Sequence, residues 1–371
     1  MRFLQEKLIA VPLPEAPELA ALFGSGEFDR RTLCADAVAR LRPMLARLAP
    51  EPEGGWLKAA YAALTDGLFP DKNDRPPEAA TRQALEVLIA ALEALLAAED
   101  APFDPLTDLL PFDEALPTRV AEEYARFRTA VAQSHFLLTL RMSRELMPFD
   151  AASHTIGVRN IAVQTALAAK AAGLPADVPL VAAAALCHDI GKFACRGSDA
   201  ARVPYLHYYY TWQWLTERSM EGIAHISANH STWDLEFENL SIESLLLIYA
   251  DFRVRGSREN GREVMRICSL AEAYGIIRSK LSNVTPEKTR RYQLVYRKLR
   301  DFEAFLRSRG VQDDGTLTAP ARRDAALLLP AEALEALRDL TFDNNVRLMN
   351  TISTEASFDL LLEQARGEKN T

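Results

Sequence analysis

The chain has 371 residues, a formal net charge of −8 and 49% hydrophobic residues, which is typical of a globular protein with room for two or three domains. Its four cysteines form no Cys-x-x-Cys pair, so the sequence favours thiols in a reducing compartment over disulfides or a structural zinc knot. No stretch reaches the roughly 18 uninterrupted apolar residues of a membrane-spanning helix, and the N-terminus loses its hydrophobicity too early for a secretory signal. We therefore expect a cytoplasmic protein with no membrane partner.

Residues 1–146 are predicted to form an N-terminal helical domain. Apolar residues recur there at three- and four-residue spacing, and alanine, leucine, arginine and glutamate dominate. The clearest single helix covers 79–99 and is followed by a proline-bearing loop near 102–117. A further long helix is expected over 117–146, where the segment from Met147 to Asp150 interrupts the pattern.

The second predicted domain is a compact helical core at 147–256, and a C-terminal helical region at 257–371 is expected to pack partly on it. Glycine and polar residues at 256–261 mark the exit from the core. Extended alternating runs are missing, so the sequence predicts an all-α fold. The helices expected beyond the core lie at about 262–282, 286–309, 321–340 and 345–367.

His188 and Asp189 stand side by side at the end of the apolar run 178–187, which predicts a buried helix. Imidazole nitrogens and carboxylate oxygens are ligands that borderline divalent metals accept. Two such groups buried without partners would each cost about a few kcal/mol. A bound metal ion is the partner that the pair predicts.

With His154 upstream, Lys192 just after the dyad and Asp251 downstream, residues 150–256 resemble the HD superfamily of metal-dependent phosphohydrolases. The signature of that family is His, then His-Asp, then Asp on separate helices of an all-α core. The resemblance implies an HD-type helical bundle flanked by N- and C-terminal helical segments. It also implies an enzyme that hydrolyses a phosphoester or phosphoanhydride of a nucleotide-like substrate with a metal-activated water. A regulatory or interaction protein whose HD unit binds metal or nucleotide without turnover is the alternative.

Two-metal members of this family carry further histidines between the dyad and the last aspartate, and His207 and His230 lie in that interval. The resemblance therefore implies one or two divalent ions, with Asp189 bridging them and taking a catalytic role together with Lys192. His/Asp sites accept Fe, Mn, Co, Ni, Zn or Mg, so the sequence leaves the metal open. Aromatic packing is an alternative explanation for His207, because its neighbours are mostly tyrosine and tryptophan. The full predicted ligand set is His154, His188, Asp189, His207, His230 and Asp251.

Substrate binding is assigned to Lys192, Arg253, Arg255 and Trp233. A guanidinium fork matches two phosphate oxygens, an ammonium offers a point charge, and an indole can stack on a base. Lys192 is equally well explained as a helix-end lysine that faces water. The expected partner is a small phosphorylated or nucleotide substrate. The acidic net charge argues against a nucleic acid, although 251–310 has a basic excess.

Three further features of the sequence restrict which residues belong to the site and which substrate it binds. Asp150 lies one turn before His154, where capping a helix is its more frequent role. His225 is expected to support a ligand or the fold, because five residues separate it from His230 and a helix would turn the two apart. The Gly-Tyr-Pro motif of the subgroup that hydrolyses cyclic di-GMP is missing, which argues against that substrate.

Overall fold

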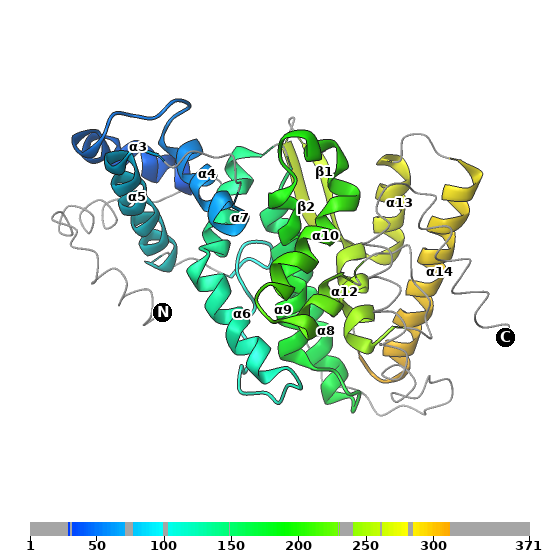
Figure 1. The fold of residues 1–371 in the computed structure, drawn as a ribbon. Coiled ribbons are helices and arrows are strands. Elements are labelled where there is room, and N and C mark those ends of the chain that lie inside the picture. Colours follow the sequence, from blue (N-terminus) through cyan, green and yellow to red (C-terminus); the bar gives the residue numbers. More distant parts are fainter. Residues whose placement is uncertain are drawn as a thin grey trace. The chain divides into compact units, whose positions relative to one another are not determined.

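The computed structural model describes residues 29, 32–70, 77–98, 103–147, 149–228, 230, 240–259, 262–280 and 285–311. Within these ranges the elements are helices and one two-stranded sheet, so the predicted all-α class is confirmed (Figure 1). None of the described helices is long and apolar enough to cross a membrane. The chain divides into two compact units, one made of 1–103 and 131–152 and the other of 104–130 and 153–371.

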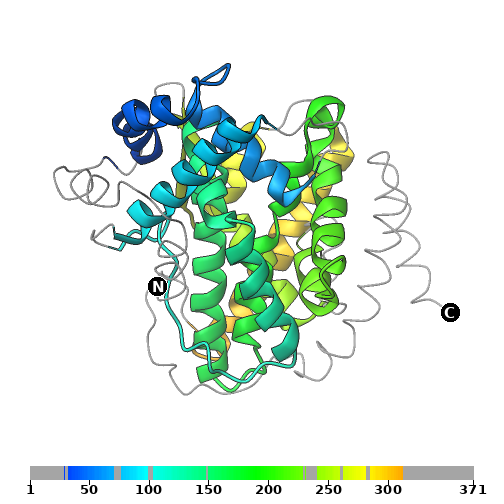
Figure 2. The ribbon, with the colours of Figure 1, turned by 60° about the vertical axis from the view of Figure 1, so that its left-hand side comes forward.

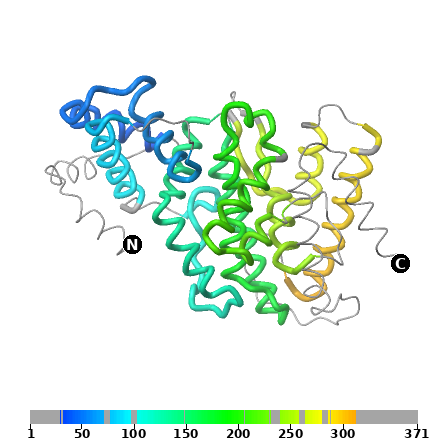
Figure 3. Tube along the Cα trace, in the orientation of Figure 1, coloured from blue at the N-terminus to red at the C-terminus, as the bar shows by residue number. Residues whose placement is uncertain are grey.

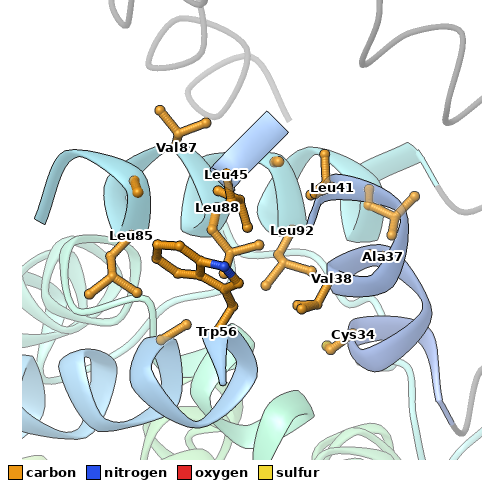
Figure 4. Close-up of a cluster of buried hydrophobic side chains, with 14 of the residues drawn as sticks. Cys34, Ala37, Val38, Leu41, Leu45, Trp56, Leu85, Val87, Leu88 and Leu92 are labelled. Atoms are coloured by element: carbon orange, nitrogen blue, oxygen red, sulfur yellow. The ribbon is translucent and has the colours of Figure 1, made fainter. Parts of the chain in front are cut away.

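The first unit is built around one apolar core. Figure 4 shows Trp56 at its centre, with Leu45, Leu88 and Leu92 around the indole ring, and all four side chains are buried. Glu145 caps the N-terminus of the neighbouring helix α3. Its carboxylate accepts hydrogen bonds from the backbone N–H groups of Cys34 and Ala35, both at 2.8 Å. The predicted helix at 79–99 is confirmed as α5. The helices are α3 (Leu33–Leu48), α4 (Trp56–Leu68), α5 (Ala79–Ala98) and α7 (Phe136–Leu146).

The helix predicted over 117–146 is instead two helices, α6 (Ala121–Gln133) and α7. The break falls at His135, whose φ of 53° places it in the left-handed region. A right-handed helix cannot continue through such a residue. The imidazole of His135 pairs with the carboxylate of Glu93 on α5, a contact distant in sequence that holds the break in place.

The second unit carries the residues that the sequence singled out. Its helix α9 is buried along its whole length, as expected for a helix that is apolar on every side. Helices α11 and α12 pack against α9, and α10 packs against α11 and η1 (Figures 1 and 2). The elements are α8 (Ala151–Ala171), α9 (Val178–Cys187), the 3₁₀ helices η1 (Ile190–Ala194) and η2 (Gly197–Arg202), α10 (Val203–Thr216), α11 (Glu221–Ala228) and α12 (Ile242–Arg253).

The units differ from the predicted domains, because 104–130 belongs with the core at 153–256 and not with the N-terminal helices. Hydrogen bonds of the Asn160 side chain on α8 are one reason why 104–130 groups with the core. Its amide nitrogen donates to the carbonyls of Pro105 and Asp108, and its oxygen accepts from the N–H of Leu110. The proline-bearing loop is thereby bound to the helix that begins near His154.

The region after the core also departs from expectation at its start. Residues 262–267 form a strand, β2 (Arg262–Ile267), which pairs antiparallel with β1 (Val254–Glu259), so the predicted helix at 262–282 is wrong for its first six residues. The hairpin brings Glu263 so close to Gly256 that any larger residue at 256 would clash with it. Figure 3 traces the chain from this hairpin into α13 (Leu270–Lys280) and α14 (Pro286–Ser308). Helix α14 confirms the prediction at 286–309, whereas those at 321–340 and 345–367 lie outside the described residues.

Candidate metal centre

The second unit brings the six predicted ligands together, each from its own position in the helical core. They form two groups, and within each group the donor atoms all lie within 4.8 Å of one another. His154 lies in the first turn of α8, and Asp251 near the end of α12. His188 and Asp189 directly follow α9, so two polar side chains stand at the end of a buried apolar helix. The groups are His154, His188 and Asp251, and Asp189, His207 and His230.

Asp189 connects the two groups. Its Oδ2 lies 3.4 Å from Nε2 of His154 and 3.2 Å from Nε2 of His188. Its Oδ1 lies 3.6 Å from Nε2 of His207 and 3.9 Å from Nε2 of His230. One oxygen of the carboxylate therefore faces each group, which is the arrangement that a ligand shared by two ions requires.

The spacing of the donor atoms fits a metal ion. Ligands about 2.0–2.2 Å from one ion, at tetrahedral to right angles, lie roughly 3.0–3.5 Å from each other. Nε2 of His154 and Oδ1 of Asp251 are 3.2 Å apart, and the two Nε2 atoms of His207 and His230 are 3.4 Å apart. These pairs already have the separation of neighbours in a coordination sphere.

The orientation of the imidazole rings also fits a metal. Nδ1 faces a backbone carbonyl in three of the four histidines, at 2.7 Å in His188, 2.6 Å in His207 and 2.5 Å in His230. When Nδ1 carries the proton for that bond, Nε2 keeps a lone pair for a ligand. Nε2 of His188 is buried and, although Oδ2 of Asp189 lies 3.2 Å away, makes no hydrogen bond of acceptable geometry within the described structure. A buried nitrogen in that state needs a partner, and a cation is one that a lone pair can bind.

Burial and neighbouring charges set four of the six candidate ligands in the protonation states that a metal requires, whereas the pKa of His154 is raised, because hydrogen bonds to Asp189 and Asp251 outweigh burial. Burial lowers the pKa of His207 to about 4 and that of His230 to about 3, so both rings are neutral at pH 7. Burial alone would raise the pKa of Asp189, but the charge of Lys192 and contacts with His188 and His154 outweigh it and hold the pKa well below the usual range. The pKa of Asp251 is likewise lowered, since Arg255 and a hydrogen bond from His154 outweigh burial. Two neutral rings therefore face carboxylates that are ionised.

Two cations border the ligands on the more accessible side. Nζ of Lys192 lies 2.5 Å from Oδ2 of Asp189, and a guanidinium nitrogen of Arg255 lies 3.6 Å from Oδ1 of Asp251. Their side chains are 29% and 20% exposed, whereas that of Asp189 is 4% exposed. Two of the three predicted phosphate-binding residues thus lie at the edge of the centre, each paired with a ligand carboxylate.

Arg253 does not lie in such a position, and its predicted role in substrate binding is not supported. The side chain is buried, Nε donates to the carbonyl of Cys268 at 2.9 Å, and a second nitrogen donates to the hydroxyl of Tyr249 at 3.1 Å. Its guanidinium also lies over the ring of Tyr249, 5.0 Å from the centroid. Arg253 therefore holds the end of α12 to the chain beyond β2.

We expect Arg253→Ala to lower the free energy of unfolding by about 1.5–3 kcal/mol, the range for hydrogen bonds made by a charged group. Arg255→Ala is the comparison, two residues away and partly exposed; it loses the ion pair with Asp251 and should lower the free energy of unfolding by less than Arg253→Ala does. Denaturant unfolding of both proteins measures this difference. Equal stability of the two variants would contradict the separate roles assigned to these arginines.

The remaining predicted residues are placed as follows. Trp233 lies outside the described residues. Asp150 belongs to the first unit, pairs with Arg144 at 3.4 Å and is a member of neither ligand group. His225 is buried in α11 and belongs to neither group. Thr211 was missed by the sequence analysis, although it stands one helical turn after His207, a spacing that places both on the same face of α10.

Comparisons of the chain with protein-family models, with curated proteins and with solved structures found no match.

Proposed function

We propose that this chain is a metal-dependent phosphohydrolase with a two-ion centre, acting on a phosphoester or phosphoanhydride of a small nucleotide-like substrate. The observation that carries the proposal is the carboxylate of Asp189, which directs one oxygen toward each of two groups of ligands. Hydrolytic two-metal sites hold their ions about 3.5–4 Å apart, a separation that a bridging carboxylate can span. The order of the six residues, which resembles the HD signature, supports the reaction class.

The donor set favours a transition metal. Four of the six ligands are imidazoles, and imidazole suits Zn, Fe, Co or Ni better than Mg, which prefers oxygen ligands and keeps several waters. When bound, such ions lower the pKa of a water molecule and offset negative charge on a phosphate. All four cysteines are buried thiols, which supports a cytoplasmic location as part of the proposal.

The chain's own residues divide the remaining work. The three backbone carbonyls that face Nδ1 hold the rings of His188, His207 and His230 in the orientation that leaves Nε2 for a ligand. Lys192 and Arg255 hold positive charge at the accessible edge. Metal ions bound to Asp189 and Asp251 would replace Lys192 and Arg255 as partners of these two carboxylates. We therefore assign the ammonium and the guanidinium to the phosphate oxygens of the substrate.

Metal analysis tests the centre. The protein loaded with Mn²⁺ or Co²⁺ should hold two ions per chain, and His207→Ala and His230→Ala should each hold one, because both residues belong to the same group. His225→Ala is the control, since that histidine is buried in α11 but belongs to neither group, and it should keep two ions. One ion in the fully loaded wild type would refute the two-ion centre.

The reaction is tested separately, with p-nitrophenyl phosphate, bis(p-nitrophenyl) phosphate and a panel of nucleotides. Release of product should require added metal and should stop with a chelator. A protein that binds two ions but releases product from none of these substrates would argue for the binding role without turnover and against the hydrolase.

A further inference from the structure

Helix α10 meets the turn after the dyad through one buried hydroxyl. Thr211 is 0% exposed, and its Oγ1 donates to the carbonyl of His188 and accepts from the N–H of Gly191, both at 3.1 Å. These two backbone groups lie on either side of Asp189, where α9 has ended and η1 begins. A single side chain from another helix therefore binds both flanks of the ligand shared by the two groups.

The backbones of η1 and α10 are in direct contact at the same place. A Cβ atom added to Gly191 would lie 2.0 Å from the carbonyl oxygen of His207 and 2.6 Å from the backbone nitrogen of Thr211. Only glycine leaves room for this approach. The backbone of His207, whose ring is a candidate metal ligand, is therefore in direct contact with the turn after the dyad.

His207 and Thr211 lie four residues apart on α10 and so share one face of the helix. The ring of His207 reaches toward Oδ1 of Asp189 at 3.6 Å, while the hydroxyl of Thr211 binds the backbone beside Asp189. Displacing α10 along or away from η1 would change both contacts together. The separation between His207 and Asp189 therefore depends on the hydrogen bonds of Thr211.

We propose that Thr211 is a positioning residue that holds His207 over Asp189 and so sets the affinity of the second group, Asp189, His207 and His230, for its ion. This inference rests on the proposed two-ion centre. The first group depends less on Thr211, because Thr211 binds the backbone of only one of its three ligands, His188, whereas His154 and Asp251 are held by α8 and α12. Residues that orient metal ligands from behind typically change metal affinity about 10–100-fold when they are replaced.

The test compares three variants with the wild type in a Co²⁺ titration that is monitored by absorption spectroscopy and by calorimetry. Thr211→Val keeps the shape and removes the hydroxyl, so the second ion should bind about 10–100-fold more weakly while the first binds nearly as before. Thr211→Ser keeps the hydroxyl and should bind both ions with affinities close to those of the wild type. Thr165→Val is the matched control, because Thr165 is also buried and its hydroxyl donates within its own helix, to the carbonyl of Ile161 at 2.8 Å.

Two binding steps of wild-type affinity in Thr211→Val would overturn the inference, and so would equal weakening of both steps. Thr211→Ser gives an independent answer even if the valine variant does not fold, because loss of the second ion in a folded serine variant would also refute the role of the hydroxyl. A wild type that binds fewer than two ions would be a different failure, that of the two-ion centre itself.

Discussion

Asp189→Asn is expected to lower metal-dependent phosphate release by at least about 10³-fold, since even residues that only support metal ligands cost roughly 10–100-fold. The substitution keeps the shape of the side chain, but it replaces one carboxylate oxygen with an amide nitrogen that cannot bind a cation. One of the two ligand groups thereby loses its contact with Asp189, and the centre loses a negative charge. Steady-state kinetics at saturating Mn²⁺ or Co²⁺ measures the loss, and metal analysis should find at most one ion.

The helical fold should survive this change with some loss of stability, because the variant no longer forms the ion pair between Asp189 and Lys192. Circular dichroism and the thermal midpoint check this. Asp199→Asn is the control, ten residues further on, where the carboxylate accepts a hydrogen bond from the hydroxyl of Tyr210 at 2.7 Å and belongs to neither ligand group. Wild-type turnover in Asp189→Asn would show that Asp189 does not bridge two ions.

Gly191→Ala is expected to have the largest effect on stability. Overpacking a filled site typically costs about 1–3 kcal/mol and sometimes more. A Cβ 2.0 Å from a backbone oxygen belongs at the upper end of that range, because a main chain cannot rotate aside as a side chain can. Helix α10 must move, so the same variant should also lose the ion held by His207. Denaturant unfolding with a chelator present isolates the effect on the fold from the effect on metal.

Gly275→Ala supplies the comparison for the same chemical change. Gly275 lies inside α13, and an added Cβ there would meet nothing within 4 Å. Alanine in a helix interior is favoured over glycine by about 0.5–1 kcal/mol, so this variant should be slightly more stable than the wild type. Similar unfolding midpoints for the two alanine variants would mean that η1 and α10 are not packed as closely as described.

Local patterns in the sequence were sufficient for most of the helices. The period of apolar residues predicted α5 and α14, and continuous apolar character predicted that α9 is buried. Local pattern failed at His135, where a pairing with Glu93 on another helix accompanies a break in the helix. It failed again at 262–267, because a strand of that length is stabilised by its partner strand and not by its own residues.

The six candidate ligands could be proposed from the sequence because metal binding demands particular side-chain types and because their order resembles the HD signature. The structure brings their donor atoms together in two groups. The loop at 104–112 could not be assigned to the core in the same way. Its backbone is bound by Asn160, about 50 residues later, and nothing in the loop itself indicates this partner.

The sequence by itself determined the helical class and which residues form the candidate site, because both depend on residue type and spacing. Only the tertiary structure decided which contacts each of these residues makes. Arg253 and Arg255 are alike in sequence, yet one is buried against Cys268 and Tyr249 and the other lies beside Asp251. Thr211 is ordinary in sequence and gains its proposed role only because α10 packs directly on the turn after the dyad. Such roles arise from contacts between distant segments, and a contact of that kind leaves no periodic trace in either segment.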